Sequence, residues 1–396
     1  MNAHILIAGG GIGALAAGLA ACRSGCSVQL FEQAAVFSEV GAGLQLGPNA
    51  TRVLQAWGLG AALGGVAAFP ECIVARSSAS GRELARLPLG RQAMERYGAP
   101  YATLHRRDLH AILLQALQEQ TGARLHLGSA VARFEQRANA VLLECEGGLS
   151  AEGVALIGAD GLWSRVREQA LADGRAQPTG HLAYRALIAR ADLPAAQRAN
   201  EVSVWLGPRQ HVVAYPVRGG DLLNLVVIVQ GSTEAHVQAW DDVGLAADVQ
   251  QALAHCCSAL QELAQAAPSW GRWSLCDRAP LAGAEQMAAG RVALLGDAAH
   301  PMRPFLAQGA AMALEDAAEL GAALAARRTG QADVPQALAR YAQRRWQRAA
   351  RVQARSRRNG QIFHLDGPLR LARDAALGLL GDRLMDLPWL YRGAAG

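Results

Sequence analysis

The sequence contains no lysine, and arginine supplies all 38 of its basic residues. Without a lysine amine the chain can form no Schiff base with a substrate. It also cannot build the phosphate-binding loop whose lysine contacts a nucleotide. The net charge of +5 is modest, and the arginines of residues 340–358 alternate with Ala, Val and Trp346, as on the exposed face of a helix. We therefore expect no nucleic-acid partner.

The seven cysteines are an odd number and contain no Cys-x-x-Cys pair. Cys22 and Cys26 are expected to share a face of the first helix, but no histidine or acid completes a zinc set beside them. Reduced thiols, no metal site and a cytoplasmic location are the resulting expectations. No apolar run reaches the roughly 20 residues of a membrane span, so no stable membrane insertion is expected.

The N-terminal residues follow the pattern of a dinucleotide-binding unit. Residues 4–8 form an apolar run typical of a buried strand, and a helical pattern continues to about residue 24. Between them, Gly9, Gly11 and Ala14 occupy the positions of a G-x-G-x-x-G/A fingerprint. The first glycine makes the turn, the second allows backbone to approach a pyrophosphate, and the small third residue packs helix on strand.

An acidic residue follows the next predicted strand, at residues 27–31. Glu32 lies about 20 residues beyond the glycines, where an acid accepts hydrogen bonds from ribose hydroxyls. A carboxylate in this place disfavours a 2′-phosphate on the bound adenosine. Because these residues also suit an ordinary nicotinamide dehydrogenase, the N-terminus alone does not decide the chemistry.

A second candidate cofactor element lies near the other end of the chain. Residues 292–295 are predicted to form a short buried strand, and Asp297 follows at its carboxyl end. A helix is expected over residues 308–325, beginning with the small residues Gly309 and Ala310. A carboxylate at a strand end and an open helix start suit a polyhydroxylated, electron-accepting cofactor.

A third motif, Ala159-Asp160-Gly161, follows a predicted strand at residues 154–158. In this order and spacing, the three motifs resemble the single-component FAD-dependent aromatic hydroxylases with the para-hydroxybenzoate hydroxylase fold. The similarity is greatest to the salicylate hydroxylase, 3-hydroxybenzoate 6-hydroxylase and 6-hydroxynicotinate 3-monooxygenase group. The stretches that carry it are residues 41–50, 97–110, 211–220 and 300–317.

The resemblance implies an α/β fold in which a Rossmann-like FAD-binding domain is interleaved with an antiparallel-sheet substrate domain, followed by C-terminal helices. Long β runs between residues 179 and 276 agree with the second domain. The expected FAD-binding domain comprises residues 1–70, 101–178 and 277–330. The expected substrate domain comprises residues 71–100 and 179–276, and the C-terminal helical region comprises residues 331–396.

The resemblance also assigns roles to individual residues. The implied FAD contacts are Gly9, Gly11, Gly13, Ala14, Glu32, Gln33, Arg106, Asp160, Gly161, Gly296, Asp297, Pro304, Gly309 and Ala310. The implied substrate contacts are Gln45, His211, Tyr215, Pro304 and Phe305. Nearby, Asp108 is expected to cap a helix over residues 109–118.

His211 and Tyr215 are the candidate catalytic pair. Strand alternation places them on one face, roughly 13 Å apart. From the residues alone, simple packing of both under a helix stays open. The resemblance makes His211 the base for a substrate phenol and Tyr215 a hydrogen-bonding partner. Either Arg185 or Arg303 is a candidate partner for a substrate carboxylate.

The implied function is hydroxylation of a small phenolic aromatic acid, resembling salicylate or hydroxybenzoate, with O2 and NADH or NADPH through a flavin C4a-hydroperoxide. The alternative is a quinone-precursor-type or other flavin monooxygenase acting on a larger aromatic or polyketide substrate. A flavin sensor without enzyme activity and a homodimer both stay open. A flavin-dependent halogenase is excluded because that family uses a lysine, which this chain lacks.

Overall fold

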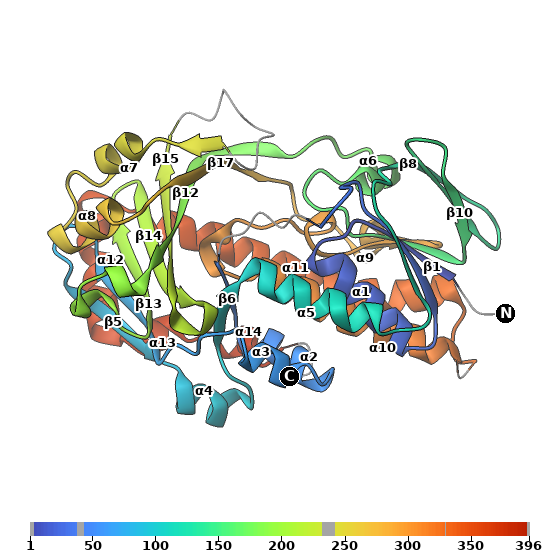
Figure 1. The fold of residues 1–396 in the computed structure, drawn as a ribbon, viewed down its shortest axis with the longest axis horizontal. Coiled ribbons are helices and arrows are strands. Elements are labelled where there is room, and N and C mark those ends of the chain that lie inside the picture. The colour runs from blue at the N-terminus through green and yellow to red at the C-terminus, as the bar shows by residue number, and fades with distance from the viewer. Residues whose placement is uncertain (1–3, 38–42, 232–241, 329, 394–396) are drawn as a thin grey trace. The chain divides into compact units, whose positions relative to one another are not determined.

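The computed structural model describes residues 4–37, 43–231, 242–328 and 330–393. Residues 41 and 42 of the stretch 41–50, which carries the family resemblance, lie outside the described residues. The chain forms two compact units, each assembled from three separate segments (Figure 1). Unit 1 comprises Met1–Glu39, Leu109–Gln177 and Asp277–Arg355. Unit 2 comprises Val40–Asp108, Pro178–Cys276 and Ser356–Gly396.

Unit 1 is built on a six-stranded sheet in the order β18-β19-β11-β1-β2-β7. All neighbouring strands in it are parallel except the short edge pair β18 and β19. The strands are β1 (His4–Ala8), β2 (Ser27–Phe31), β7 (Ala123–His126), β11 (Ala155–Gly158), β18 (Ala288–Ala289) and β19 (Val292–Leu294). The predicted strands at both cofactor motifs are therefore confirmed, and they belong to one sheet.

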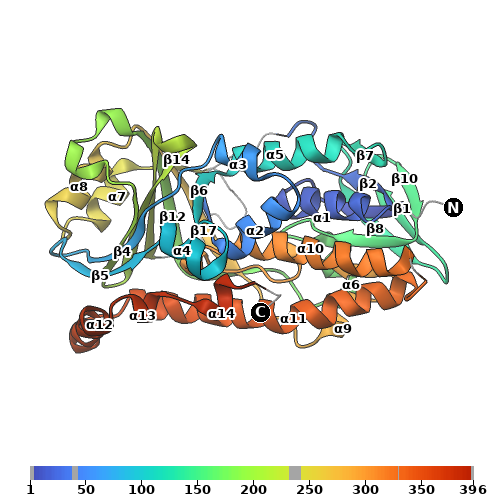
Figure 2. The same cartoon turned by 90° about the horizontal axis from the view of Figure 1, so that it is seen from below.

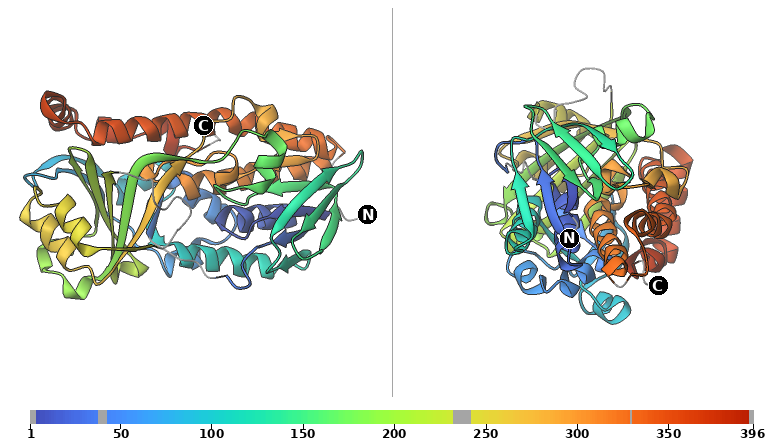
Figure 3. Two further views of the ribbon diagram at one scale, coloured as in Figure 1. Left: turned by 90° about the horizontal axis from the view of Figure 1, so that it is seen from above. Right: turned by 90° about the vertical axis from the view of Figure 1, so that its right-hand side faces the viewer.

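Helices α1 (Ile12–Arg23) and α10 (Gly309–Arg328) lie side by side in unit 1 (Figure 2). Small residues allow this close packing, because a Cβ on Gly321 would lie 3.0 Å from the Cβ of Ala20. Helix α11 (Val334–Phe363) runs beside α10 (Figure 3). Ion pairs connect the two helices. Strands β8 (Val131–Gln136), β9 (Val141–Cys145) and β10 (Ser150–Gly153) form a separate three-stranded antiparallel sheet.

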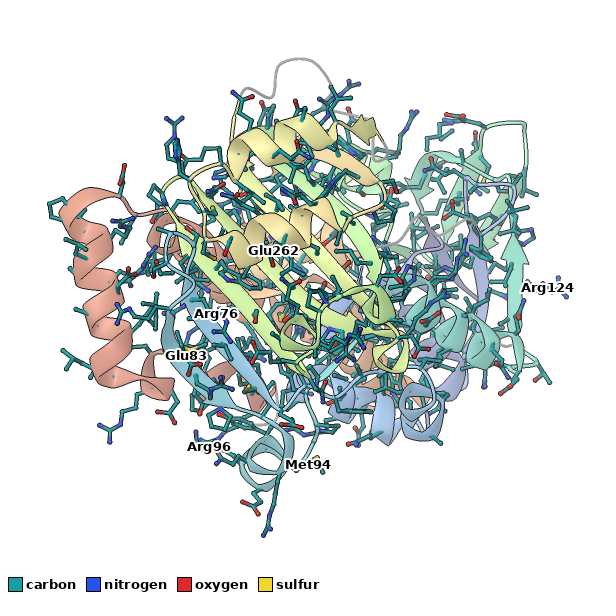
Figure 4. The ribbon with its side chains drawn as sticks, turned by 60° about the vertical axis from the view of Figure 1, so that its left-hand side comes forward. Arg76, Glu83, Met94, Arg96, Arg124 and Glu262 are labelled. Atoms are coloured by element: carbon teal, nitrogen blue, oxygen red, sulfur yellow. The ribbon has the colours of Figure 1, made fainter. Side chains whose placement is uncertain are left out.

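Unit 2 is built on an eight-stranded, mainly antiparallel sheet in the order β16-β17-β12-β15-β14-β13-β4-β5. Only β13 and β4 are parallel among its described pairings. The strands are β4 (Cys72–Ser77), β5 (Glu83–Pro88), β12 (Gln177–Ala189), β13 (Glu201–Gly207), β14 (Gln210–Val217), β15 (Leu222–Gln230), β16 (Asp242–Gly244) and β17 (Trp270–Asp277). Figure 4 marks Arg76 on β4 and Glu83 on β5, at the edge of this sheet.

The two faces of this sheet have different partners. One face packs on α7 (Ala246–Ala252) and α8 (Ser258–Gln265), and its core includes Val212, Ala214, Leu225 and Val227. Because side chains alternate along a strand, His211 and Tyr215 point to the opposite face. The predicted common face of these two residues is therefore confirmed.

The remaining elements of unit 2 are short. Strands β3 (Gly43–Leu46) and β6 (Ala102–His105) form a separate antiparallel pair. The helices are α2 (Pro48–Ala56), α3 (Gly60–Gly64), α4 (Gly90–Tyr97), α12 (Gly367–Leu380), α13 (Asp382–Met385) and α14 (Pro388–Tyr391). Within the described ranges, every helix is too short or too polar to cross a membrane.

Two local predictions were wrong. Helix α5 (Arg106–Gln118) begins before Asp108, so that residue lies in the first turn and is not the cap. Helix α1 ends at Arg23, and Cys26 lies beyond it instead of sharing a helical face with Cys22. All seven cysteines fall among the described residues, and none forms a disulfide.

The division into FAD-binding and substrate-binding domains stays a prediction. Residues 40–70 and 101–108, expected with the cofactor motifs, cluster with the antiparallel sheet. The expected C-terminal region is split between the units at residue 355, within α11.

Candidate active site

The predicted cofactor motifs meet at one edge of the unit 1 sheet. Ala8 pairs with Gly158 of β11 and with Phe31 of β2, and Gly158 pairs in turn with Leu294 of β19. Strands β1, β2, β11 and β19 are parallel, and their carboxyl ends lie side by side at one edge of the sheet. The residues that follow them are Gly9, Ala159-Asp160, Glu32 and Leu295-Gly296-Asp297. The carboxyl edge of an open parallel sheet is where such folds bind ligands.

Two positions of the fingerprint are occupied by glycine for different structural reasons. Gly9 has a φ of 103°, and a Cβ there would lie 2.5 Å from the carbonyl oxygen of Ala159, so the fold itself requires glycine. Gly11 has an ordinary φ of −75°, and a Cβ there would meet no described heavy atom within 4 Å. The space beside Gly11 is therefore open to a ligand.

The N-terminus of α1 adjoins that space. Gly11 is its N-cap residue, and no described side chain caps the helix. The first N–H groups of a helix lack partners within the helix and favour anions. Gly13 and Ala14 follow on the packed side, because a Cβ on Gly13 would lie 3.1 Å from Leu295 Cδ2 and Ala14 is fully buried. A pyrophosphate fits this open helix start.

Glu32 lies beside the same glycine turn. A Cβ added at Gly10 would be 2.7 Å from Oε2 of Glu32, and the other carboxylate oxygen accepts a hydrogen bond from Ala34 N over 2.8 Å. Gln33 is exposed. His110 Nε2 lies 2.8 Å from the Gly10 carbonyl oxygen and so supports the turn. This places a carboxylate where the ribose hydroxyls of a dinucleotide are expected.

Asp297 is exposed at the end of β19, next to the start of α10. Its Oδ1 lies 3.9 Å from the position that a Cβ on Gly309 would take, so the strand end and the helix start are adjacent. Ala310 follows in the first turn of this 20-residue helix. The structure thus brings together a carboxylate and a helix N-terminus formed by small residues, as predicted from the sequence.

Asp160 has a local structural task. Its Oδ2 accepts hydrogen bonds from the backbone N–H groups of Arg165 (2.8 Å) and Val166 (3.1 Å), while Ser164 Oγ donates to Oδ1 over 2.5 Å. These contacts hold the start of α6 (Arg165–Leu171). Burial raises the pKa of Asp160, and these hydrogen bonds oppose the shift. Gly161 has a φ of 77°, which glycine adopts readily.

A buried ion network stabilises the loop that contains Asp297. Asp316 accepts a hydrogen bond from Gly296 N over 3.0 Å and lies 2.5 Å from His300 Nε2. Arg345 of α11 donates to Asp316 over 2.7 Å and to Glu315 over 2.7 Å. Burial alone would raise the pKa of Asp316, but His300 and Arg345 hold it well below its usual range. The carboxylate is therefore charged, and it stabilises the loop.

Arg167 supports the same loop from another side. It is 1% exposed and donates to the carbonyl oxygens of Ala298 (3.1 Å) and Ala299 (2.9 Å) as well as to Asp173. At this burial Arg167 cannot serve as a surface charge. The sequence gives no sign of this support, because the carbonyl partners lie 131 and 132 residues away.

In unit 2, His211 is 1% exposed and is packed against the residues that end α11. Its Nδ1 lies 2.8 Å from Nε2 of His364, and its ring makes an edge contact with Phe363 at 5.3 Å between centroids. Burial lowers the pKa of His211 well below 6.5, and His364 and His181 add to the shift. The ring is thus neutral at pH 7, the protonation state that a base needs.

Tyr215, at the other end of the same strand face, lies under the β3–β6 pair. A Cβ on Gly43 would be 2.6 Å from the Tyr215 ring, and Gly43 N donates to Asn224 Oδ1 over 2.7 Å. Tyr101 donates its hydroxyl hydrogen to Gln45 Oε1 over 2.7 Å. Burial raises the pKa of Tyr215, and Arg185 and Gln45 oppose the shift. Its hydroxyl therefore keeps its proton and can donate it in a hydrogen bond.

Arg185 lies between the two candidate catalytic residues on this face. Its row of the sheet comes between the rows of His211 and Tyr215. The three rows are Ala183–Ile228–His211, Arg185–Val226–Val213 and Leu187–Asn224–Tyr215. The Arg185 guanidinium stacks over the Trp273 ring, 3.5 Å from its centroid.

The other candidate for a carboxylate partner, Arg303, belongs to unit 1 and donates to Asp277 over 3.1 Å. Pro304 and Phe305 follow it in a short 3₁₀ turn, where Pro304 is exposed and Phe305 is 4% exposed. Among the predicted FAD contacts, Arg106 belongs to unit 2 and the others belong to unit 1. Gln45, a predicted substrate contact, also belongs to unit 2. The individual roles of all these residues stay predictions.

Several residues of the site had no signal in the sequence. His364 is 153 residues from His211, and Asn224 becomes relevant only because its strand pairs with that of Tyr215. Tyr101 belongs to a stretch that carried the family resemblance, but its contact with Gln45 required the β3–β6 pairing. No cluster of three or more metal-binding side chains is found in the described part of the chain.

Comparison with known proteins agrees with this geometry. Residues 2–356 match the family model described as "FAD binding domain". The chain is 40% identical over 390 residues to 3-hydroxybenzoate 6-hydroxylase of Polaromonas naphthalenivorans (strain CJ2), covering 98% of this chain and 95% of the relative.

Two solved structures extend the similarity. Klebsiella pneumoniae HpxO complexed with FAD and uric acid has a TM-score of 0.85 and 25% identity, covering 100% of this chain and 98% of the other. A salicylate hydroxylase substrate complex has a TM-score of 0.83 and 26% identity, covering 98% and 95%.

Proposed function

Because this chain belongs to the family of FAD-dependent aromatic hydroxylases, we propose that it hydroxylates a small phenolic carboxylic acid with NADH or NADPH and O2. Family membership makes it a FAD-dependent monooxygenase. The proposal concerns the substrate class and the residues that act on it. Hydroxybenzoate is the model substrate, since 3-hydroxybenzoate appears in the name of a relative that is 40% identical.

One observation carries the choice of substrate class. A single face of the unit 2 sheet presents a neutral histidine, an arginine and a tyrosine hydroxyl in three successive rows. Same-face neighbours along a strand are about 7 Å apart, so this spacing suits a molecule of one aromatic ring. His211 suits a phenol, Arg185 suits a carboxylate and Tyr215 suits a second oxygen of the substrate.

The residues of unit 1 fit FAD. Gly11 and the start of α1 offer open backbone to the pyrophosphate, Glu32 offers a carboxylate to the adenine ribose, and Asp297 offers one to the ribityl chain. When bound, FAD supplies the redox chemistry: it takes hydride from the nicotinamide and, once reduced, activates O2. The chain itself binds and orients the reactants.

His211 is the proposed base. A phenolate ring is a much better nucleophile than a phenol ring, so removal of the phenol proton prepares the substrate for attack on an electrophilic oxygen. A neutral imidazole can take that proton at Nε2, and the low pKa of His211 keeps it neutral in the resting enzyme. Tyr215 keeps its proton and orients the ring through a donated hydrogen bond.

The test is a His211→Ala variant with Tyr215→Phe as its comparison. We expect His211→Ala to reduce FAD at the parent rate, to hydroxylate about 10²-fold more slowly and to release more hydrogen peroxide. The defect should shrink at high pH, where the phenol ionises unaided. Tyr215→Phe should be milder, since it keeps the ring. If His211→Ala hydroxylates at the parent rate with parent coupling, His211 only packs the sheet.

Two further points stay predictions. Seven free thiols suit the reducing conditions of the cytoplasm, which cell fractionation would test. Homodimer formation would be measured by light scattering of the purified protein.

A further inference from the structure

A second histidine contacts the proposed base. His364 directly follows α11, and its Nε2 lies 2.8 Å from Nδ1 of His211. The two rings are 5.0 Å apart between centroids and tilted by 44°. The residues are 1% and 7% exposed, so water competes little for this hydrogen bond.

The hydrogen bond couples the tautomers of the two rings. A neutral imidazole carries one N–H, so only one of the two nitrogens in contact can donate. If His211 donates from Nδ1, its Nε2 carries a lone pair and can accept a proton from a substrate. If His364 donates from Nε2, then Nε2 of His211 already carries hydrogen, and His211 cannot act as a base there.

The chain holds His364 in place through its backbone. His364 N donates to the Gly360 carbonyl over 3.2 Å, and the His364 carbonyl accepts from Arg209 N over 3.3 Å. Arg373 of α12 donates to the Phe363 carbonyl over 2.7 Å, which fixes the end of α11. The His364 ring that contacts His211 is therefore carried by a segment that these hydrogen bonds hold in place.

The other ionisable groups near the pair favour neutral rings. Burial lowers the pKa of His364 to about 4, and His181 of β12 and Arg373 add to the shift. His181 is itself oriented, because its Nδ1 lies 2.9 Å from the carbonyl oxygen and 3.2 Å from the hydroxyl oxygen of Thr179. A neutral His364 has a lone pair, so it can accept a hydrogen bond from His211.

We propose that His364 is a positioning residue for the reaction: it accepts a hydrogen bond from Nδ1 of His211 and so leaves Nε2 of His211 as the base. When that base takes the phenol proton, both its nitrogens carry hydrogen, and the bond to His364 stabilises the resulting cation. This inference rests on the proposed function, because it requires His211 to act on a phenol.

The test compares three replacements of His364 in the FAD-loaded enzyme. His364→Phe and His364→Leu remove the acceptor, whereas His364→Gln keeps an acceptor oxygen at a similar reach from the backbone. We expect the Phe and Leu variants to bind FAD and melt near the parent temperature. Their coupled hydroxylation of 3-hydroxybenzoate at neutral pH should fall about tenfold, and more peroxide should be released. A fall of this size corresponds to the loss of one hydrogen bond to a charged group. The Gln variant should stay within about twofold of the parent.

A binding titration gives a second readout that needs no turnover. Ultraviolet difference spectra measure the pKa of the bound phenol, because phenolate absorbs at longer wavelength. The parent and the Gln variant should lower this pKa relative to free substrate, whereas the Phe and Leu variants should lose at least half of that lowering. The hydroxylation defect should shrink as the pH approaches the phenol's own pKa, about 10.

The outcomes separate the two levels of the proposal. If the Phe and Leu variants keep the parent rate, coupling and bound-phenol pKa while His211→Ala is impaired, His364 has no positioning role. A Gln variant as impaired as the Phe variant would likewise show that only ring packing matters. If His211→Ala also behaves like the parent, the base assignment itself fails.

Discussion

Replacing Gly11 by Ala should separate binding of the cofactor from stability of the fold. The φ of −75° at Gly11 is open to alanine, and the new methyl group would meet no described heavy atom within 4 Å. Loss of a helix N-cap glycine costs roughly 1 kcal/mol, and the lower entropy of the unfolded chain returns about 0.4–1 kcal/mol. The apoprotein should therefore melt within about 3 °C of the parent.

FAD binding should respond very differently to the same change. The methyl group would occupy the space where backbone approaches the pyrophosphate, and it would weaken hydrogen bonds from the start of α1. Each hydrogen bond to a charged group is worth about 1.5–3 kcal/mol, so loss of one raises the Kd for FAD roughly 10- to 150-fold. Fluorescence quenching of FAD added to apoprotein measures this Kd.

Two other glycines provide controls for Gly11→Ala. Gly64→Ala, also with open space at Cβ but in α3 of unit 2, should change neither melting nor Kd. Gly9→Ala should destabilise the apoprotein itself, because its Cβ would lie 2.5 Å from the Ala159 carbonyl oxygen. A Gly11→Ala protein that binds FAD as tightly as the parent would refute the assignment of the pyrophosphate to this helix start.

Four further variants probe other residues of the two candidate sites and the ion network. Glu32→Ala and Asp297→Ala should each lower the flavin-to-protein absorbance ratio after gel filtration, because each removes an acceptor for cofactor hydroxyls; unchanged ratios in both would contradict the site. Asp316→Asn should lower the free energy of unfolding by about 3–5 kcal/mol at pH 7, since it breaks a buried ion pair with Arg345. Because the pKa of Asp316 is depressed in the folded state, the difference in unfolding free energy between parent and variant should be full above pH 4 and should shrink as the pH falls below it. Urea denaturation between pH 7 and pH 3 measures this difference. A difference that stays constant over this range would argue against the network. Arg185→Gln should weaken the binding of 3-hydroxybenzoate roughly 10- to 100-fold and leave the binding of 3-hydroxybenzamide, which has no carboxylate, unchanged. Equal losses for both ligands would show that Arg185 does not bind the carboxylate.

The cofactor side of the fold could be predicted because its signals are local. Strands β1 and β2 have the predicted bounds, and the glycines, Glu32 and Asp297 directly adjoin the strands that position them. Parallel pairing then brings these residues to one edge of a sheet, which is a general property of such folds.

The substrate side depends on contacts that local sequence does not reveal. Alternation along β14 predicted the shared face of His211 and Tyr215, but only the register of β12, β15 and β14 places the Arg185 row between them. The His211–His364 contact joins a strand to the end of a distant helix. Asp108 was assigned as a cap because its residue type suits that role, but the helix begins two residues earlier.

The most direct test of the central claim is incorporation of oxygen from ¹⁸O2 into product by the FAD-loaded enzyme. A panel of hydroxybenzoates would be supplied with NADH or NADPH, and product mass, coenzyme oxidation and peroxide would be measured together. The account predicts that at least one phenolic acid gains a single ¹⁸O atom for each coenzyme oxidised, with little peroxide. Coenzyme oxidation that yields only peroxide with every phenolic acid, or product oxygen that comes from water, would contradict it.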